Sequence, residues 1–162
     1  MTPPTTASTD QLRDWLLTGA DLAEGRHQRA AVELLDFADL LGRRDVRTHI
    51  DTRVITDDGR ARHIARVDWT ALAAADLGPL GGAQQRLLKL AISIAGGVPV
   101  DLRYVTSGEL GAAHARAALA AVVRALGLAD DVQISDTPDY LERKRAHDEW
   151  LSEFENGTGS RA

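Results

Sequence analysis

The chain has 162 residues, a formal net charge of −5 at pH 7 and no cysteine. Its 44% of apolar and 27% of charged residues are typical of a globular protein and exclude a disordered chain. The lack of cysteine excludes a disulfide framework and thiolate-bound zinc or iron–sulfur sites, and the length predicts one domain.

The two ends of the chain predict tails. Residues 1–7 are rich in Thr and Pro and residues 156–162 in Gly and Ser, so we expect disordered tails around a single globular domain at 8–155. The first residues show no signal-peptide pattern, and the absence of cysteine suits the cytoplasm, so we expect a cytoplasmic protein. The longest apolar run, 90–100, is far below the roughly 20 residues of a membrane span, so no membrane partner is expected.

Two helices are predicted before any strand. Ser8 and Gln11 have the spacing of a capping box and predict a helix that ends near Leu17. An amphipathic pattern from 21 to 41 predicts the second helix, and Gly42 follows as its expected stop.

A β-hairpin is predicted from His49 to Trp69. Asp58-Gly59 is a favoured pair for a two-residue type I′ turn, and it sets Asp57 opposite Arg60. This register gives the hairpin one largely apolar face, which includes His63, and one charged face. The charged outer face contains Arg53, Ile55, Arg62, Ile64 and Arg66.

Further helices follow the hairpin. A short helix capped by Asp68 precedes a helical core at 83–126, in which Gly96-Gly97 ends one helix. Thr106 with Glu109 predicts a capping box for a second helix, 109–126. Thr137 and Pro138 predict a C-terminal helix at 138–155. The fold class is therefore α+β and predominantly α-helical, with about six helical segments and one β-hairpin.

No motif predicts catalysis, a cofactor or a metal. The chain has no nucleophile elbow, phosphate-binding loop, dinucleotide fingerprint or zinc-protease motif. Glu24 and His27 match half of a di-iron motif that needs further glutamates on facing helices. An enzyme would need His63 to gather acids from distant segments. We therefore expect a protein without enzymatic activity, cofactor or metal.

Two surfaces predict a protein-interaction or assembly module. The outer hairpin face frames Ile55 and Ile64 with Arg53, Arg62 and Arg66, and arginines beside apolar residues are typical of interfaces. Trp150 and Phe154 give the last helix a second apolar surface. A protein partner or a homodimer is the leading hypothesis for function.

The alternative is a DNA-binding regulator resembling a helix-turn-helix. The helix at 109–126 would then contact DNA through His114, Arg116 and Arg124. The chain is acidic overall, whereas phosphate contacts usually need several lysines or arginines, so nucleic acid is the disfavoured partner.

Overall fold

The computed structural model describes residues 6–23, 25–106 and 110–158, with side chains to residue 152. It is 59% helical with one two-stranded antiparallel sheet, which confirms the predominantly helical α+β class. Residues Met1–Val132 and Gln133–Ala162 form two compact units, and only α8 belongs to the second. The elements in order are α1 (Thr9–Leu22), α2 (Arg26–Phe37), α3 (Arg44–Arg47), β1 (Ile50–Asp57), β2 (Arg60–Val67), α4 (Trp69–Ala74), α5 (Gly82–Gly96), α6 (Leu102–Thr106), α7 (Ala112–Ala125) and α8 (Pro138–Thr158).

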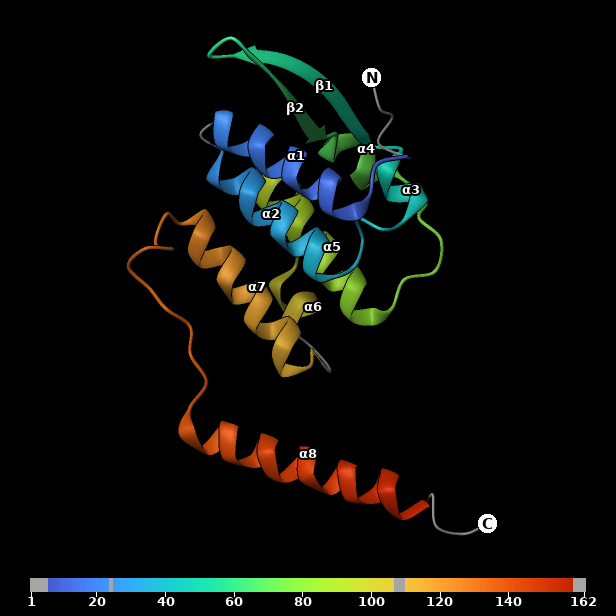
Figure 1. The fold of residues 1–162 in the computed structure, drawn as a ribbon, viewed down its shortest axis with the longest axis vertical. Helices are drawn as coiled ribbons and strands as arrows, with labels where there is room; N and C mark the ends of the chain where they lie inside the picture. The colour runs from blue at the N-terminus through green and yellow to red at the C-terminus, as the bar shows by residue number, and fades with distance from the viewer. Residues whose placement is uncertain (1–5, 24, 107–109, 159–162) are drawn as a thin grey trace. The chain divides into compact units, whose positions relative to one another are not determined.

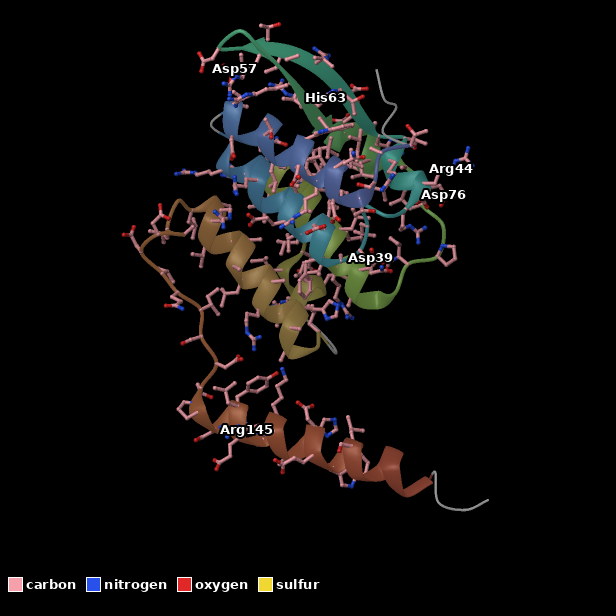
Figure 2. The ribbon with its side chains drawn as sticks, viewed as in Figure 1. Asp39, Arg44, Asp57, His63, Asp76 and Arg145 are labelled. Atoms are coloured by element: carbon pink, nitrogen blue, oxygen red, sulfur yellow. The ribbon has the colours of Figure 1, made fainter. Side chains whose placement is uncertain are left out.

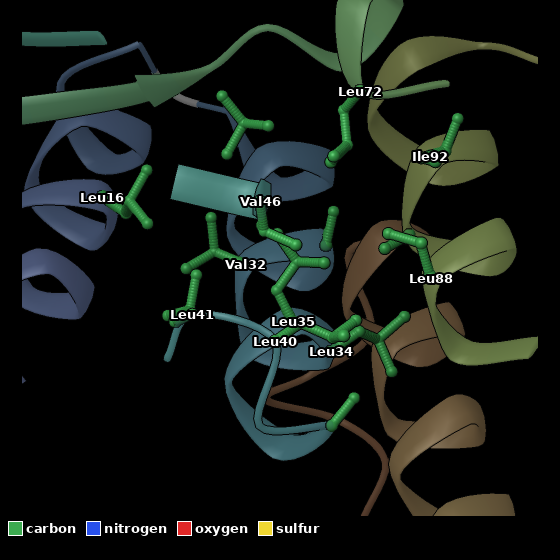
Figure 3. Close-up of a cluster of buried hydrophobic side chains, with 14 of the residues drawn as sticks. Leu16, Val32, Leu34, Leu35, Leu40, Leu41, Val46, Leu72, Leu88 and Ile92 are labelled. Atoms are coloured by element: carbon green, nitrogen blue, oxygen red, sulfur yellow. The ribbon is translucent and has the colours of Figure 1, made fainter. Parts of the chain in front are cut away.

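The first unit is built in layers around α2 (Figure 1). Helix α2 contacts α1 on one side and both α5 and α7 on the other, and β2 of the hairpin packs against α1. Leucines fill the interior between these layers, among them Leu35, Leu40 and Leu41, which are fully buried (Figure 3). Burying leucines from several layers supplies most of the favourable free energy of folding.

The hairpin has the predicted register. Asp57 pairs with Arg60, and the pairing continues to Ile50 opposite Val67. Asp58 and Gly59 have φ angles of 49° and 74°, the left-handed values that a type I′ turn requires at both central positions. The two-residue turn therefore sets the register of both strands, as the sequence predicts.

The predicted faces of the hairpin hold only near its base. Val54 is 47% exposed and His63 is exposed, although both were expected on the core face, while Ile64 of the outer face is only 7% exposed. The reason is that α1 packs against β2 and not along the whole inner face. Ile64 and Ala65, consecutive residues on opposite faces of β2, are both buried, whereas in the far half of β1 Val54 is exposed and Ile55 half-buried.

Helix α2 ends earlier than the position of Gly42 predicts. Asp39 takes a left-handed φ of 56°, its N–H donates to the carbonyl of Asp36, and the N–H of Leu40 donates to the carbonyl of Leu35. These two bonds are the Schellman arrangement, and both leucines are fully buried beside it. Asp39 thus does what was expected of Gly42, and the predicted end at Leu41 is wrong.

Other helix boundaries follow local signals. The side chains of Ser8, Asp68 and Thr137 accept from backbone N–H groups at the starts of α1, α4 and α8, as predicted. Helix α7 begins at Ala112, after a Gly111 cap with no side-chain bond, so the expected start near 109 is wrong. Glu109 of the predicted capping box lies outside the described residues.

A buried cation holds the start of α1. Arg47 is 8% exposed, and its guanidinium donates to the carbonyls of Leu41 and Ala7, at 2.6 Å each, and to the Thr9 hydroxyl at 3.0 Å. Ala7 is itself buried, so the prediction of a disordered tail through residue 7 is wrong. A single side chain thus fixes the α1 entry to the corner between α2 and α3.

Arg47→Met should destabilise the fold because it removes these bonds and leaves two carbonyl groups without their charged donor. We expect a loss of about 2 to 4 kcal/mol in the free energy of unfolding, measured by urea titration. The neighbouring exposed Arg44→Met is the matched control and should change it by less than about 0.5 kcal/mol. Equal losses in the two variants would contradict the structural role of Arg47.

Close packing of α1 on β2 depends on Gly19. A Cβ at this position would overlap the backbone carbonyl oxygen of Ala65. Gly19→Ala should therefore cost about 1 to 3 kcal/mol, because backbone cannot yield as a flexible side chain does. Gly82→Ala in α5, whose Cβ would meet only Arg86 Nη1 at 3.8 Å, is the control and should be neutral or stabilising. Thermal unfolding of both variants distinguishes the two effects.

Candidate protein-binding site

Helix α7 packs on α2 through small and polar side chains. The face turned inward carries His114, Ala117, Ala121 and Arg124, at the i, i+3, i+7 and i+10 spacing of one helix face. Ala121 is buried, and the His114 ring stands nearly perpendicular to the Phe37 ring, at 5.5 Å between centroids. Alanines on this face let the two helices approach closely, so the larger apolar side chains of α7 point elsewhere.

The large apolar side chains of α7 form an exposed stripe. Leu119 is 52% exposed, Val122 36% and Leu126, the capping residue, 62%. With Ala115, also exposed, they follow the i, i+4, i+7 and i+11 spacing of a single helix face. We call these four residues the α7 stripe. An exposed apolar face with this spacing is typical of a surface that packs against another helix.

Part of the α7 stripe lines a groove between α7 and α6, with Leu90 of α5 also in its lining. Helices α6 and α7 are neighbours in the ribbon (Figure 1). The volume of the groove is about 370 Å³, and Thr106 is the one polar residue among the described side chains that line it. Leu102 of α6, 65% exposed, stands at its edge. The remaining lining residues are Leu90, Val105, Leu110, Ala115, Ala118, Leu119 and Val122.

Ion pairs fix the opposite side of α7. Arg124 donates to Glu33 of α2 at 2.7 Å, and Glu33 also pairs with Arg29 at 3.4 Å. Arg29 in turn donates to Asp21 of α1 at 2.5 Å, a hydrogen bond that raises the pKa of Arg29. This chain of charges joins α7, α2 and α1, and it orients the α7 stripe away from α2.

The three residues of the DNA-binding hypothesis do not form an outward basic surface. Arg124 is engaged with Glu33 and His114 with Phe37, both on α2. Arg116 is half-buried on another side of α7. The helix therefore presents apolar side chains, rather than these basic groups, along its exposed stripe.

The five predicted residues of the outer hairpin face are not equally accessible. Arg53, Arg62 and Arg66 are exposed, and Arg62 pairs with Asp57 at 3.1 Å. Ile55 is half-buried, and the burial of Ile64 leaves little apolar surface between the arginines. The structure thus brings the arginines together on this face but not two exposed isoleucines.

In the second unit, α8 carries Trp150, which is 56% exposed and stacks on His147 at 6.1 Å between ring centroids. Leu141 and Leu151 are also exposed. The side chain of Phe154 lies outside the described residues. Helix α8 therefore has apolar side chains on its surface, and their role in binding a partner stays a prediction.

The two histidines considered for catalysis or metal binding lie on different elements. His63 stacks on Trp15 at 4.8 Å between ring centroids, on the hairpin (Figure 2), and His27 is exposed on α2. Glu24 lies outside the described residues. Within the described ranges, no group of three His, Asp or Glu side chains is placed to hold a metal ion.

A carboxylate holds the glycine-rich loop before α5. Asp45 of α3 accepts from Arg43 at 2.6 Å and from the N–H groups of Gly78 and Val46 at 3.2 and 3.0 Å. Arg43 also donates to the carbonyl of Pro79. The hydrogen bond from Arg43 is the main cause that lowers the pKa of Asp45 to about 2, with the two N–H donors adding to it and partial burial opposing it.

The lowered pKa of Asp45 predicts that the free energy of unfolding depends on pH in the acid range. Because the folded pKa of Asp45 lies below its unfolded value, the carboxylate stabilises the fold above about pH 4, and this contribution is lost as the pH falls towards 2. The difference in unfolding free energy between wild type and Asp45→Asn should therefore shrink between pH 4 and 2, as measured by urea titration. Asp76→Asn, exposed in the same loop, is the matched control. A difference independent of pH would contradict this prediction.

The sequence did not reveal the groove. It showed that α7 is apolar on several sides, which predicts a core helix. It did not show that the alanine side faces α2 while the Leu and Val side stays uncovered. One feature of the sequence could have indicated the exposed face. The large apolar residues at 119, 122 and 126 lie on a different side of the helix from the alanines at 117 and 121.

The chain matches no protein-family model, no curated protein and no solved structure. Of the helices in the described part, none is both long and apolar enough to cross a bilayer. The geometry of the chain itself therefore carries the functional proposal.

Proposed function

We propose that this protein is a non-enzymatic, cytoplasmic protein-interaction module that binds a helix of a partner along the α7 stripe and the adjacent groove. The observation that carries the proposal is the run of exposed large apolar side chains on one helix face, Leu119, Val122 and Leu126, with Leu102 across the groove. Single exposed apolar residues are ordinary on protein surfaces, but a contiguous set beside an apolar groove is typical of a binding surface.

A helix is the occupant that this shape favours. Helix-binding grooves take apolar side chains at i, i+3 or i+4 and i+7 from the partner, and they are formed between neighbouring helices. The groove here lies between α6 and α7, and its described lining is apolar except for Thr106. An apolar lining offers few hydrogen-bonding groups for a small polar substrate, whereas it suits leucine and valine side chains.

DNA binding is the less supported proposal. It would need basic groups that reach phosphates, and two of its three residues are engaged with α2. The arginines of the hairpin are exposed, but Asp51 and Asp57 stand opposite Arg66 and Arg60 on the paired strand. Interleaved charges of this kind favour solvent and protein contacts over a polyanion.

A photoreactive side chain at Leu119 tests the proposal. Leu119→benzoylphenylalanine in the full chain should form covalent protein adducts on irradiation in cells, because the position is exposed and lies at the groove. Mass spectrometry of the adducts identifies the partner. The same substitution at Val54, which is 47% exposed on the hairpin, is the matched control.

The yield of adducts from position 119 should exceed that from position 54 several-fold. Adding Val122→Glu to the Leu119 variant should lower its yield to that of position 54, because a carboxylate cannot be buried unpaired in the contact. Equal adduct yields at positions 119 and 54 would contradict the proposal. Circular dichroism confirms that each exposed substitution leaves the helices intact.

A further inference from the structure

We infer that the partner of the α7 stripe is a second copy of this chain, with the two α7 helices packed antiparallel about a two-fold axis. This inference rests on the proposed function, since it names the occupant of the same surface. It is drawn from two properties of α7: the order of large and small residues along the stripe, and the distribution of charge along the helix and the segment that follows it.

The stripe is complementary to itself when it is reversed. A two-fold axis midway between Leu119 and Val122 sets each of these residues opposite the other in the second copy. The same axis sets Ala115, the small residue of the stripe, opposite Leu126, which is the most exposed of its large side chains. A protruding leucine thus meets an alanine at both ends, which is the alternation that lets two helices pack closely.

The charges of this segment also favour the antiparallel orientation. Arg116 lies in the first half of α7, whereas Asp130 and Asp131 follow its end. His114, also in the first half, is engaged with Phe37 of α2. The dipole of the helix adds partial positive charge at its start and partial negative charge at its end. Antiparallel packing sets Arg116 of each copy towards the end of α7 in the other copy, where the helix dipole is negative and the acidic segment follows. Parallel packing would instead set Arg116 beside Arg116 and aspartates beside aspartates.

The remaining charged group of α7 does not oppose this contact. Arg124 is turned to α2 and donates to Glu33, and the four stripe residues carry no charge. A dimer through the stripe therefore requires no unpaired charge to be buried at its centre.

Paired cysteine variants test both the partner and the register, because the full chain contains no cysteine of its own. Ala115→Cys and Leu126→Cys are purified separately and then oxidised alone or as an equimolar mixture. In the proposed dimer, position 115 of one copy faces 126 of the other, within the short Cα separation that a disulfide needs. The same position in the two copies, 115 with 115 or 126 with 126, is offset by 11 residues, or about 16 Å along the helix. A disulfide cannot bridge this distance.

We expect the mixture to give at least about five-fold more disulfide-linked dimer than either variant alone. Ala120→Cys, exposed on another side of α7, is the control partner for Leu126→Cys and should give no such enrichment. Light scattering of the unmodified chain should show a concentration-dependent rise from 17.5 kDa towards twice that mass, and Leu119→Glu should remain monomeric.

Two results would overturn the inference. Equal cross-linking in the mixture and in the single variants would exclude the antiparallel register, and a monomer at all concentrations would exclude the second copy as partner. Photo-adducts at position 119 with a different protein would keep the proposed function and reject the self-association. An absence of adducts above the control would reject both.

Discussion

The buried guanidinium of Arg47 is the constraint on which the rest of the first unit depends. A charge removed from water is costly unless its hydrogen bonds are satisfied, and here carbonyl groups from two distant parts of the chain accept them. One carbonyl belongs to Ala7, just before α1, and the other to Leu41, just after α2. The first helix is thereby held at the corner where the chain turns into the hairpin. Since β2 packs on α1, the position of the hairpin follows from the same contact.

Helix α2 connects α1 to the candidate site on α7. It carries α1 on one side and α7 on the other, and Glu33 and Arg29 on its surface link charges from both neighbours. The alanines of α7 that face α2 let the two helices approach closely. Because these side chains are small, the orientation of α7 on α2 depends on polar pairs such as Arg124 with Glu33. The apolar stripe is exposed because α7 packs through its smallest residues.

The local structure was largely predictable, whereas the assignment of faces was not. The turn at Asp58-Gly59 and the cap at Ser8 depend on neighbouring residues alone, so the sequence predicts them correctly. Asp39 replaced Gly42 as the end of α2 because burial of Leu40 against the helix compensates for a left-handed aspartate. The exposure of His63, the burial of Ile64 and the exposure of Leu119 each depend on which distant element lies alongside. That information is carried by tertiary contacts and not by the period of a single segment.

The close approach of α1 to the backbone of β2 at Gly19 also bears on how the hairpin behaves among other chains. A two-stranded sheet has two edges at which an unrelated strand can add by backbone pairing, which is a common start of aggregation. Here the backbone of β2 lies against a helix at Ala65, so that edge is shielded. The other edge, β1, carries Asp51, Arg53 and Asp57, and charged side chains on an edge strand discourage such pairing. The glycine that allows tight packing therefore also protects the sheet from strand addition, and a bulkier residue there would weaken both properties at once.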